Sequence, residues 1–126
     1  MYNFNYHRPA TVAEAAALFG KASDARYLAG GQSLIAALKM RLAQPSDLID
    51  LSGIAELRAI KVDSTNVTIG ALTTHNAVAT SKDVQRVIPA LAKLADGIGD
   101  RQIRNAGTIG GALANNDPAA CYPAAA

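Results

Sequence analysis

The sequence predicts an α+β protein in which a small α/β subdomain, residues 1–52, precedes the first part of a second α+β subdomain, residues 53–126. Two observations carry this prediction. Strand-like apolar runs alternate with helix-like stretches over residues 4–51, an order typical of an α/β unit. Beyond residue 52 two short runs alternate apolar and polar residues around a turn, which is typical of a hairpin.

The first predicted elements are a short strand around residues 4–6 and a helix that begins after Pro9. Thr11 and Glu14 have the spacing of a capping box, and Gly20 fits the end of that helix. The residues that share one helical face are Val12, Ala15, Ala16 and Phe19.

A buried strand over residues 26–29 then leads into two glycines, and Ser33 is a good N-cap for a second helix. We expect Pro45 to end this helix and residues 47–51 to form a third strand. The face of the second helix consists of Leu34, Ala37, Leu38 and Leu42.

In the second subdomain, residues 60–62 and 67–69 form the predicted hairpin, and residues 73–81 a short capped helix. A longer helical pattern follows over residues 82–95, in which Pro89 either starts a second helix or kinks the first. The glycines of residues 96–100 break that pattern.

Composition excludes several function classes. The formal charge of +2 and the absence of a Lys/Arg cluster interleaved with aromatic residues argue against nucleic-acid binding. The single cysteine, Cys121, excludes an internal disulfide and a multi-cysteine metal or iron–sulfur site within this chain. No leader-like segment or integral membrane segment is evident, so we expect a cytoplasmic protein. The sequence stops at Ala126 soon after a loop-like segment, which predicts a fragment of a longer domain.

Two glycine-rich stretches are the strongest candidate binding elements. Residues 29–34 (AGGQSL) lie between a predicted strand and a predicted helix, and residues 107–112 (GTIGGA) are expected to form a second loop. Glycine backbone at a helix start leaves N–H groups without intrahelical partners, which suits a phosphate. A plain strand-to-helix turn is an equally good interpretation of the first stretch alone, and neither stretch matches a P-loop or a Rossmann fingerprint. Two such loops, with hydroxyls at Ser33 and Thr108, could hold a diphosphate from two sides.

Five stretches of the chain resemble the FAD-binding domain of molybdenum hydroxylases, the family of the carbon monoxide dehydrogenase medium subunit and the flavin part of xanthine dehydrogenase. They are FNYHRPATVAEAAAL, LAGGQSL, MRLAQPSDLIDL, IGALTTH and IRNAGTIGGALANNDPAACYPAA. The resemblance implies the fold of vanillyl-alcohol-oxidase-like flavoproteins, apparently truncated here, with FAD as the cofactor. It further implies an oxidoreductase component, inactive alone, that passes electrons from [2Fe–2S] clusters through FAD to an external acceptor. The partners implied are a molybdopterin-containing large subunit and an iron–sulfur small subunit, which carry the molybdenum cofactor and the clusters.

By resemblance, the cofactor-binding residues fall in three groups. They are Ala29, Gly30, Gly31, Gln32, Ser33 and Leu34; Thr108, Ile109, Gly110, Gly111, Ala112, Asn115 and Asp117; and Thr73, Thr74 and His75. Family members often carry Asn where this chain has Ala112, and an acidic residue where it has Cys121. Two alternatives stay open: a truncated domain that no longer binds FAD and serves as a structural or assembly module, and a generic phosphate- or nucleotide-binding module.

The remaining polar residues predict no catalytic or metal site in this chain. His7 is expected to be structural, Cys121 a small packing residue, and Asp100 with Arg101 and Arg104 a solvated turn. No Ser/His/Asp arrangement is recognisable, which suits a protein whose cofactor carries the chemistry.

Overall fold

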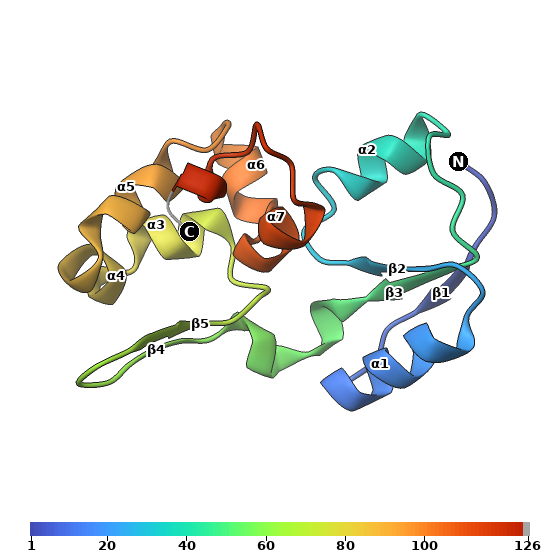
Figure 1. Cartoon of the computed structure of the whole chain (residues 1–126), viewed down its shortest axis with the longest axis horizontal. Coiled ribbons are helices and arrows are strands. Elements are labelled where there is room, and N and C mark those ends of the chain that lie inside the picture. The colour runs from blue at the N-terminus through green and yellow to red at the C-terminus, as the bar shows by residue number, and fades with distance from the viewer. Residues whose placement is uncertain (125–126) are drawn as a thin grey trace. The chain divides into compact units, whose positions relative to one another are not determined.

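The computed structural model of the chain describes residues 1–124 and divides into two units, Met1–Ala55 and Glu56–Ala126 (Figure 1). Helices and short strands occur in both, so the predicted α+β class is confirmed. The division falls after Ala55, whereas the sequence placed it after residue 52. The assignment of the two parts as FAD-binding subdomains stays a prediction.

The first unit contains a parallel three-stranded sheet of β1 (Asn5–His7), β2 (Ala25–Leu28) and β3 (Asp47–Asp50), in the order β1-β3-β2. The predicted alternation of strands and helices is therefore correct. The central strand β3 supplies Leu48 and Ile49, which are 4% and 0% exposed and form the middle of the unit's core.

Helices α1 (Val12–Lys21) and α2 (Leu34–Lys39) connect these strands and cover opposite faces of the sheet (Figure 1). The connection from β1 to β2 crosses the position of β3, and the connection from β2 to β3 runs back. Because parallel crossovers are right-handed, two crossovers in opposite directions place their helices on opposite faces.

Helix α1 begins as the sequence predicts, but it buries less of the predicted face than expected. The Thr11 hydroxyl accepts from the Glu14 N–H at 3.1 Å, while the Glu14 carboxylate accepts from the Ala10 N–H at 2.9 Å. Of the four residues on the predicted face only Ala15 is buried, whereas Val12 and Phe19 are 47% and 41% exposed. Leu18 is partly buried, and the Phe19 ring stacks on Tyr27 of β2 with ring centroids 4.7 Å apart.

Helix α2 ends earlier than predicted. It stops at Lys39, before Pro45 could end it, because Arg41 takes a left-handed backbone with φ 59°. Leu38 is buried as expected, but Leu42 lies beyond the helix and is 74% exposed.

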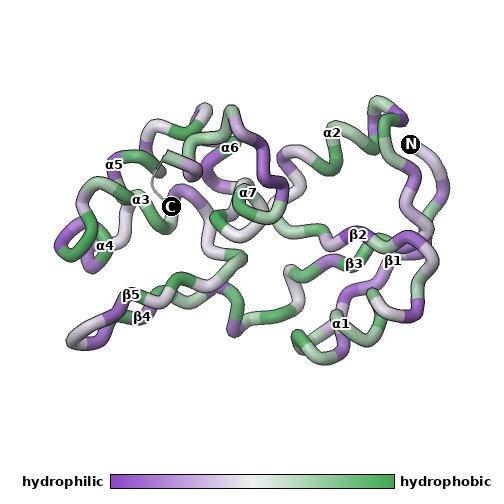
Figure 2. Tube along the Cα trace, in the orientation of Figure 1, coloured by the Kyte–Doolittle hydropathy of each residue, from purple (hydrophilic) through white to green (hydrophobic). Residues whose placement is uncertain are grey.

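The second unit opens with the predicted hairpin, in which β4 (Ile60–Val62) pairs antiparallel with β5 (Val67–Ile69). Hydrophobic and hydrophilic residues alternate along both strands (Figure 2). The Asp63 carboxylate accepts from the Thr65 and Asn66 N–H groups at 2.8 Å each and closes the turn.

Three helices cover the apolar side of this hairpin and form the second core. They are α3 (His75–Thr80), α4 (Lys82–Val87) and α5 (Pro89–Asp96). Their buried side chains, which include Val78 and Val84 at 0% exposure, pack against partly buried residues of both strands. Pro89 starts a separate helix, which decides between the two predicted outcomes at that position.

The rest of the unit contains two helices that the sequence prediction missed. Asp100 accepts from the Ile103 N–H at 2.8 Å and caps α6 (Arg101–Ala106), so the predicted solvated turn is wrong. The predicted second glycine loop is wrong as well, because Ile109–Asn115 forms helix α7. Short 3-10 turns occur at Leu51–Gly53, Ala55–Arg58 and Tyr122–Ala124.

Candidate functional site

The first glycine segment, residues 29–34, forms the turn between β2 and α2. Gly31 has φ 75°, a backbone that favours glycine. A Cβ at this position would lie 2.6 Å from Ile35 Cδ1. The glycine therefore lets the chain turn from the sheet edge directly into the helix.

The backbone N–H groups of Gly30, Gly31, Gln32, Ser33 and Leu34 donate to no acceptor within residues 1–124. Ser33 occupies the N-cap position, yet its backbone is αR (φ −96°, ψ −50°) and its side chain makes no capping bond. The side chains of Gln32 and Ser33 are exposed. Free donors at an accessible glycine turn can receive an anion such as a phosphate.

The second glycine segment, residues 107–112, uses all its N–H donors except that of Thr108 within the protein. The Ile109 N–H donates to the Thr73 carbonyl at 3.0 Å and the Gly110 N–H to the Ala71 carbonyl at 2.9 Å. Gly111 donates to Thr108 Oγ1 at 3.1 Å, and Ala112 to the Thr108 carbonyl at 3.0 Å. The predicted backbone nest for a phosphate is therefore not formed here.

Close packing explains two glycines of the second segment. A Cβ on Gly110 would lie 2.6 Å from both the Cβ and the carbonyl oxygen of Ala71. A Cβ on Gly107 would lie 2.6 Å from His75 Nε2. Neither position has room for a side chain, so glycine is needed there whether or not a ligand binds.

The fold brings the third predicted group, Thr73, Thr74 and His75, against the second segment. Thr74 and Thr108 form an isolated antiparallel bridge, and the His75 N–H donates to the Gly107 carbonyl at 3.0 Å. Thr74 also caps α3 by accepting from the Ala77 N–H at 3.2 Å. Thr73 is 2% exposed, and its hydroxyl has no hydrogen-bond partner within the described residues.

His75 is a buried residue of the same cluster. It is 5% exposed, and its Nδ1 lies 3.2 Å from the Tyr122 hydroxyl. Burial lowers the pKa of His75 and raises the pKa of Tyr122 to about 12, to which the neighbouring Cys121 adds. The pair therefore stays uncharged at neutral pH and attaches the Tyr122–Ala124 turn to α3.

Asn115 and Asp117 lie at the exposed end of α7. Asn115 is the last residue of the helix, and the Asp117 carboxylate accepts from the Ala119 N–H at 2.9 Å. Cys121 is exposed, so the expectation that it packs in the interior is wrong.

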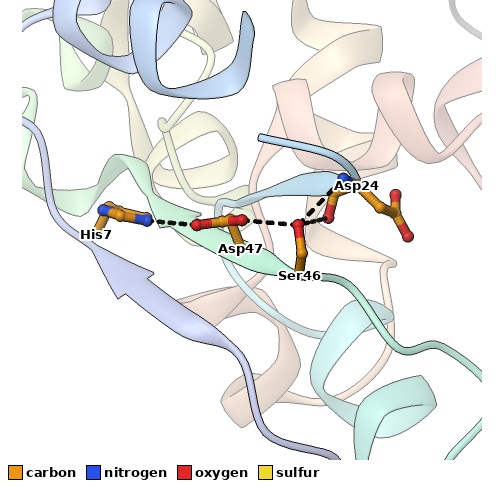
Figure 3. Close-up of polar contacts among 4 residues, drawn as sticks. All are labelled: His7, Asp24, Ser46 and Asp47. Carbon is orange, nitrogen blue, oxygen red and sulfur yellow. Dashed lines mark hydrogen bonds and ion pairs between the residues drawn. The ribbon is translucent and has the colours of Figure 1, made fainter. Parts of the chain in front are cut away.

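Sequence reasoning missed a hydrogen-bonded cluster on the first unit, shown in Figure 3. His7 Nε2 lies 2.7 Å from Asp47 Oδ1, and the Ser46 hydroxyl donates to Asp47 Oδ2 at 2.7 Å. Ser46 also bonds the backbone of Asp24. These bonds, that from Ser46 first and that from His7 second, lower the pKa of Asp47.

Although the cluster contains Ser, Asp and His, the carboxylate lies between the other two (Figure 3). A nucleophilic triad needs the imidazole between serine and carboxylate, so that the base can take the serine proton. The cluster instead ties β1, β3 and the start of β2 together. Signals for it were present only as isolated polar residues near strand ends, which have no characteristic spacing.

Other features of the described chain do not add a site. No group of three His, Cys, Asp or Glu side chains within residues 1–124 is arranged to hold a metal ion. An open depression beside the β4–β5 turn is lined by Asp63, Arg86 and Ile88 among others, and its lining includes none of the predicted cofactor residues. No helix in the described part of the chain is long and apolar enough to cross a membrane.

Comparison with known proteins agrees with this fold. The chain is 48% identical over 122 residues to the carbon monoxide dehydrogenase medium chain of Hydrogenophaga pseudoflava, covering 96% of this chain and 42% of that protein. It is 46% identical to the corresponding chain of Afipia carboxidovorans, covering 97% of this chain and 43% of that protein. A solved carbon monoxide dehydrogenase from Hydrogenophaga pseudoflava superposes with a TM-score of 0.90 at 50% identity, over 92% of this chain and 41% of that one.

The chain thus spans about two fifths of the length of these relatives. Residues 2–126 match the family model described as the FAD binding domain in molybdopterin dehydrogenase. The resemblance seen in the glycine segments and the flanking stretches is confirmed by this match. The chain belongs to the family of FAD-binding domains of molybdopterin dehydrogenases.

Proposed function

We propose that this chain is the FAD-binding part of the flavoprotein subunit of a molybdenum hydroxylase, an oxidoreductase component that is inactive alone. The observation that carries the proposal is the first glycine segment, where five consecutive N–H groups, from Gly30 to Leu34, have no acceptor within the described residues. Membership of a FAD-binding family supplies the ligand class. FAD carries a pyrophosphate, and unpaired N–H groups at a glycine turn are suited to bind it.

The first segment fits the cofactor by its chemistry. Gly30 and Gly31 expose backbone donors, and Ser33 adds a hydroxyl that no other group uses. Ala29 and Leu34 are partly buried and hold the two ends of the turn. Gln32 is exposed and can donate through its amide group.

The second and third groups contribute in another way. Because the N–H groups of Ile109 to Ala112 already have protein acceptors, this stretch would meet FAD through the side chains of Ile109 and Ala112 and the bare backbone of the two glycines between them. Thr73 is kept as a proposed contact because its buried hydroxyl has no hydrogen-bond partner within the described residues. Thr74, His75 and Thr108 position it through the bridge and caps described above, while Asn115 and Asp117 are proposed as outer contacts.

When bound, FAD would supply the redox exchange between iron–sulfur clusters and an external acceptor. This chain would orient the cofactor and shield its phosphates. The proposed partners are a molybdopterin-containing large subunit and an iron–sulfur small subunit, and the proposed location is the cytoplasm. The medium-chain names of the relatives support a multi-subunit assembly.

One observation favours a second candidate, a generic phosphate- or nucleotide-binding module. The first glycine segment leaves five consecutive N–H groups without an acceptor within residues 1–124, whereas in the second only the Thr108 N–H has none. The donors expected from two segments for a diphosphate therefore come almost entirely from one. A single phosphate would need no more than this. Competition between FAD, FMN and ADP separates the two candidates.

The test is a titration of the purified chain with FAD, followed by quenching of flavin fluorescence. We expect saturable binding, with FMN and ADP competing only at much higher concentration. Gly30→Val places a branched side chain among the free N–H groups and is expected to abolish binding, with circular dichroism to confirm that the variant is folded. Equal affinity for ADP and FAD would favour the generic module. A folded wild-type chain that binds none of them would favour the structural or assembly module.

A further inference from the structure

The end of α2 carries the two most exposed large apolar side chains within residues 1–124, Met40 at 69% and Leu42 at 74%. Arg41 lies between them with its guanidinium 5.6 Å from the centre of the Tyr2 ring. Tyr2 is itself 41% exposed, and Lys39 precedes Met40. We call these five residues, Tyr2, Lys39, Met40, Arg41 and Leu42, the α2-end patch; hydrophobic and hydrophilic residues follow one another here (Figure 2).

The local backbone does not explain this composition. The Arg41 N–H donates to the Leu38 carbonyl at 3.2 Å and the Leu42 N–H to the Ala37 carbonyl at 2.9 Å, which is a Schellman helix end. That motif usually has glycine at the left-handed position, where this chain has Arg41 with φ 59°. It also usually packs the next apolar residue back against the helix, whereas Leu42 points away into solvent. Both departures leave a large side chain, that of Arg41 or Leu42, on the surface and make the helix end less favourable than the usual motif.

The charge on the patch is not neutralised by the rest of the chain. Neither Lys39 nor Arg41 forms an ion pair with any residue from 1 to 124. No Asp or Glu occurs between Asp24 and Asp47 in the sequence. Two apolar side chains are therefore flanked by two unpaired cations.

We propose that the α2-end patch docks a partner protein chain, one that presents a hydrophobic pocket edged by aspartate or glutamate carboxylates. Met40 and Leu42 fill the pocket, and Lys39 and Arg41 pair with its rim. A second copy of this chain fits poorly, because pairing the patch with itself would oppose like charges. A membrane surface fits poorly too, because two cations fall short of the clusters of four to eight that anionic lipids select.

The test rests on the proposed function, since it uses the assembled complex with the molybdopterin and iron–sulfur subunits. Treatment with a carbodiimide, which couples amines directly to carboxylates in contact, is followed by peptide mass spectrometry. We expect Lys39 to couple to an Asp or Glu of a partner chain. Lys61 of the second unit lies outside the patch and is the control lysine. An intact complex without a Lys39 coupling, or a coupling to a carboxylate of this same chain, would overturn the proposal.

A variant series gives an independent result. The double change Met40→Asp and Leu42→Asp alters only exposed side chains and is expected to reduce co-purified partner more than tenfold. The matched control is Val12→Asp, which changes a side chain that is 47% exposed elsewhere on the same unit. Unchanged assembly of the double variant would contradict the proposal, and so would failure of the wild-type chain to assemble. Two further outcomes would overturn it: a variant that loses only its binding to anionic vesicles, or a wild-type chain that associates with itself through the patch. The FAD titration, run on the same variants, reports separately on the proposed function, because none of these residues belongs to the proposed cofactor site.

Discussion

Residues 29–34 and residues 107–112 both place glycines and a hydroxyl side chain at the start of a helix. In the first segment the N–H groups from Gly30 to Leu34 have no acceptor within the described chain. In the second the N–H groups from Ile109 to Ala112 all donate to protein oxygens. Segments of similar composition thus differ in what they leave available for a ligand.

Two causes contribute. The Thr73 and Ala71 carbonyls accept from the Ile109 and Gly110 N–H groups, and the capping residues of the two segments differ in backbone. Thr108 is extended (φ −120°, ψ 152°), so its hydroxyl turns back and accepts from Gly111. Ser33 is αR (φ −96°, ψ −50°) and makes no such bond. An extended N-cap closes the first helical turn on itself, whereas an αR residue at that position leaves the donors open. Capping geometry and the neighbouring carbonyls, and not glycine content, therefore decide how many N–H groups each segment leaves free.

The largest expected effect is on the stability of the second segment. Gly110→Ala should destabilise the protein by about 1–3 kcal/mol, because the new Cβ would lie 2.6 Å from the Ala71 Cβ and carbonyl oxygen. Urea unfolding followed by circular dichroism measures this. The control is Gly20→Ala, which meets no atom within 4 Å and should stabilise the helix by about 0.5–1 kcal/mol. Equal effects at both positions would show that the close packing at Gly110 is not important.

The next effect is on binding at the first segment. Ser33→Ala removes a hydroxyl that makes no protein bond, so we expect FAD affinity to fall about tenfold with little change in fold. Fluorescence titration gives the dissociation constant. Ser33→Thr keeps the hydroxyl and should retain most of the affinity. Unchanged affinity in the alanine variant would remove Ser33 from the proposed site.

A smaller effect is the difference in unfolding free energy when the hydroxyl of Thr108 or that of Ser33 is removed. Thr108→Ala loses the capping bond to Gly111 and should cost about 1 kcal/mol, whereas Ser33→Ala should change stability by less than about 0.5 kcal/mol. Thr108→Ser serves as the control because it keeps the bond. If both alanine variants lost the same free energy of unfolding, the conclusion that Thr108 caps its helix and Ser33 does not would be contradicted.

The smallest effect is the pH dependence of the second segment, through His75 beside Gly107. Burial lowers the pKa of His75 below its ordinary 6.5 in the folded state, so the unfolded chain binds the proton first as pH falls. Its contribution to stability is therefore complete above about pH 6.5 and declines as pH falls from there toward the folded pKa. Thermal unfolding across pH 5–8 measures this, and His75→Gln should flatten the dependence. A wild-type stability that rises on acidification would contradict the burial of a neutral imidazole.

Much of the fold could be predicted because it depends on local pattern. The strand–helix alternation of the first unit, the hairpin, the Thr11 cap and the start of a helix at Pro89 all follow from spacing within a few residues. Helix α7 was missed because glycines usually oppose helix formation. Its first turn is stabilised instead by bonds to Ala71 and Thr73, far away in the sequence.

By itself the sequence determined the family, the order of elements in the first unit and the positions of the candidate cofactor residues, because motifs and periodicity are local properties. Only the tertiary structure decided which backbone donors stay free, which apolar faces remain exposed and where His75 is buried. Those properties depend on partners thirty or more residues away, as in the contact of Gly110 with Ala71 and of His75 with Tyr122. A backbone N–H has one hydrogen to donate, so it is available to a ligand only where the fold places no protein acceptor beside it.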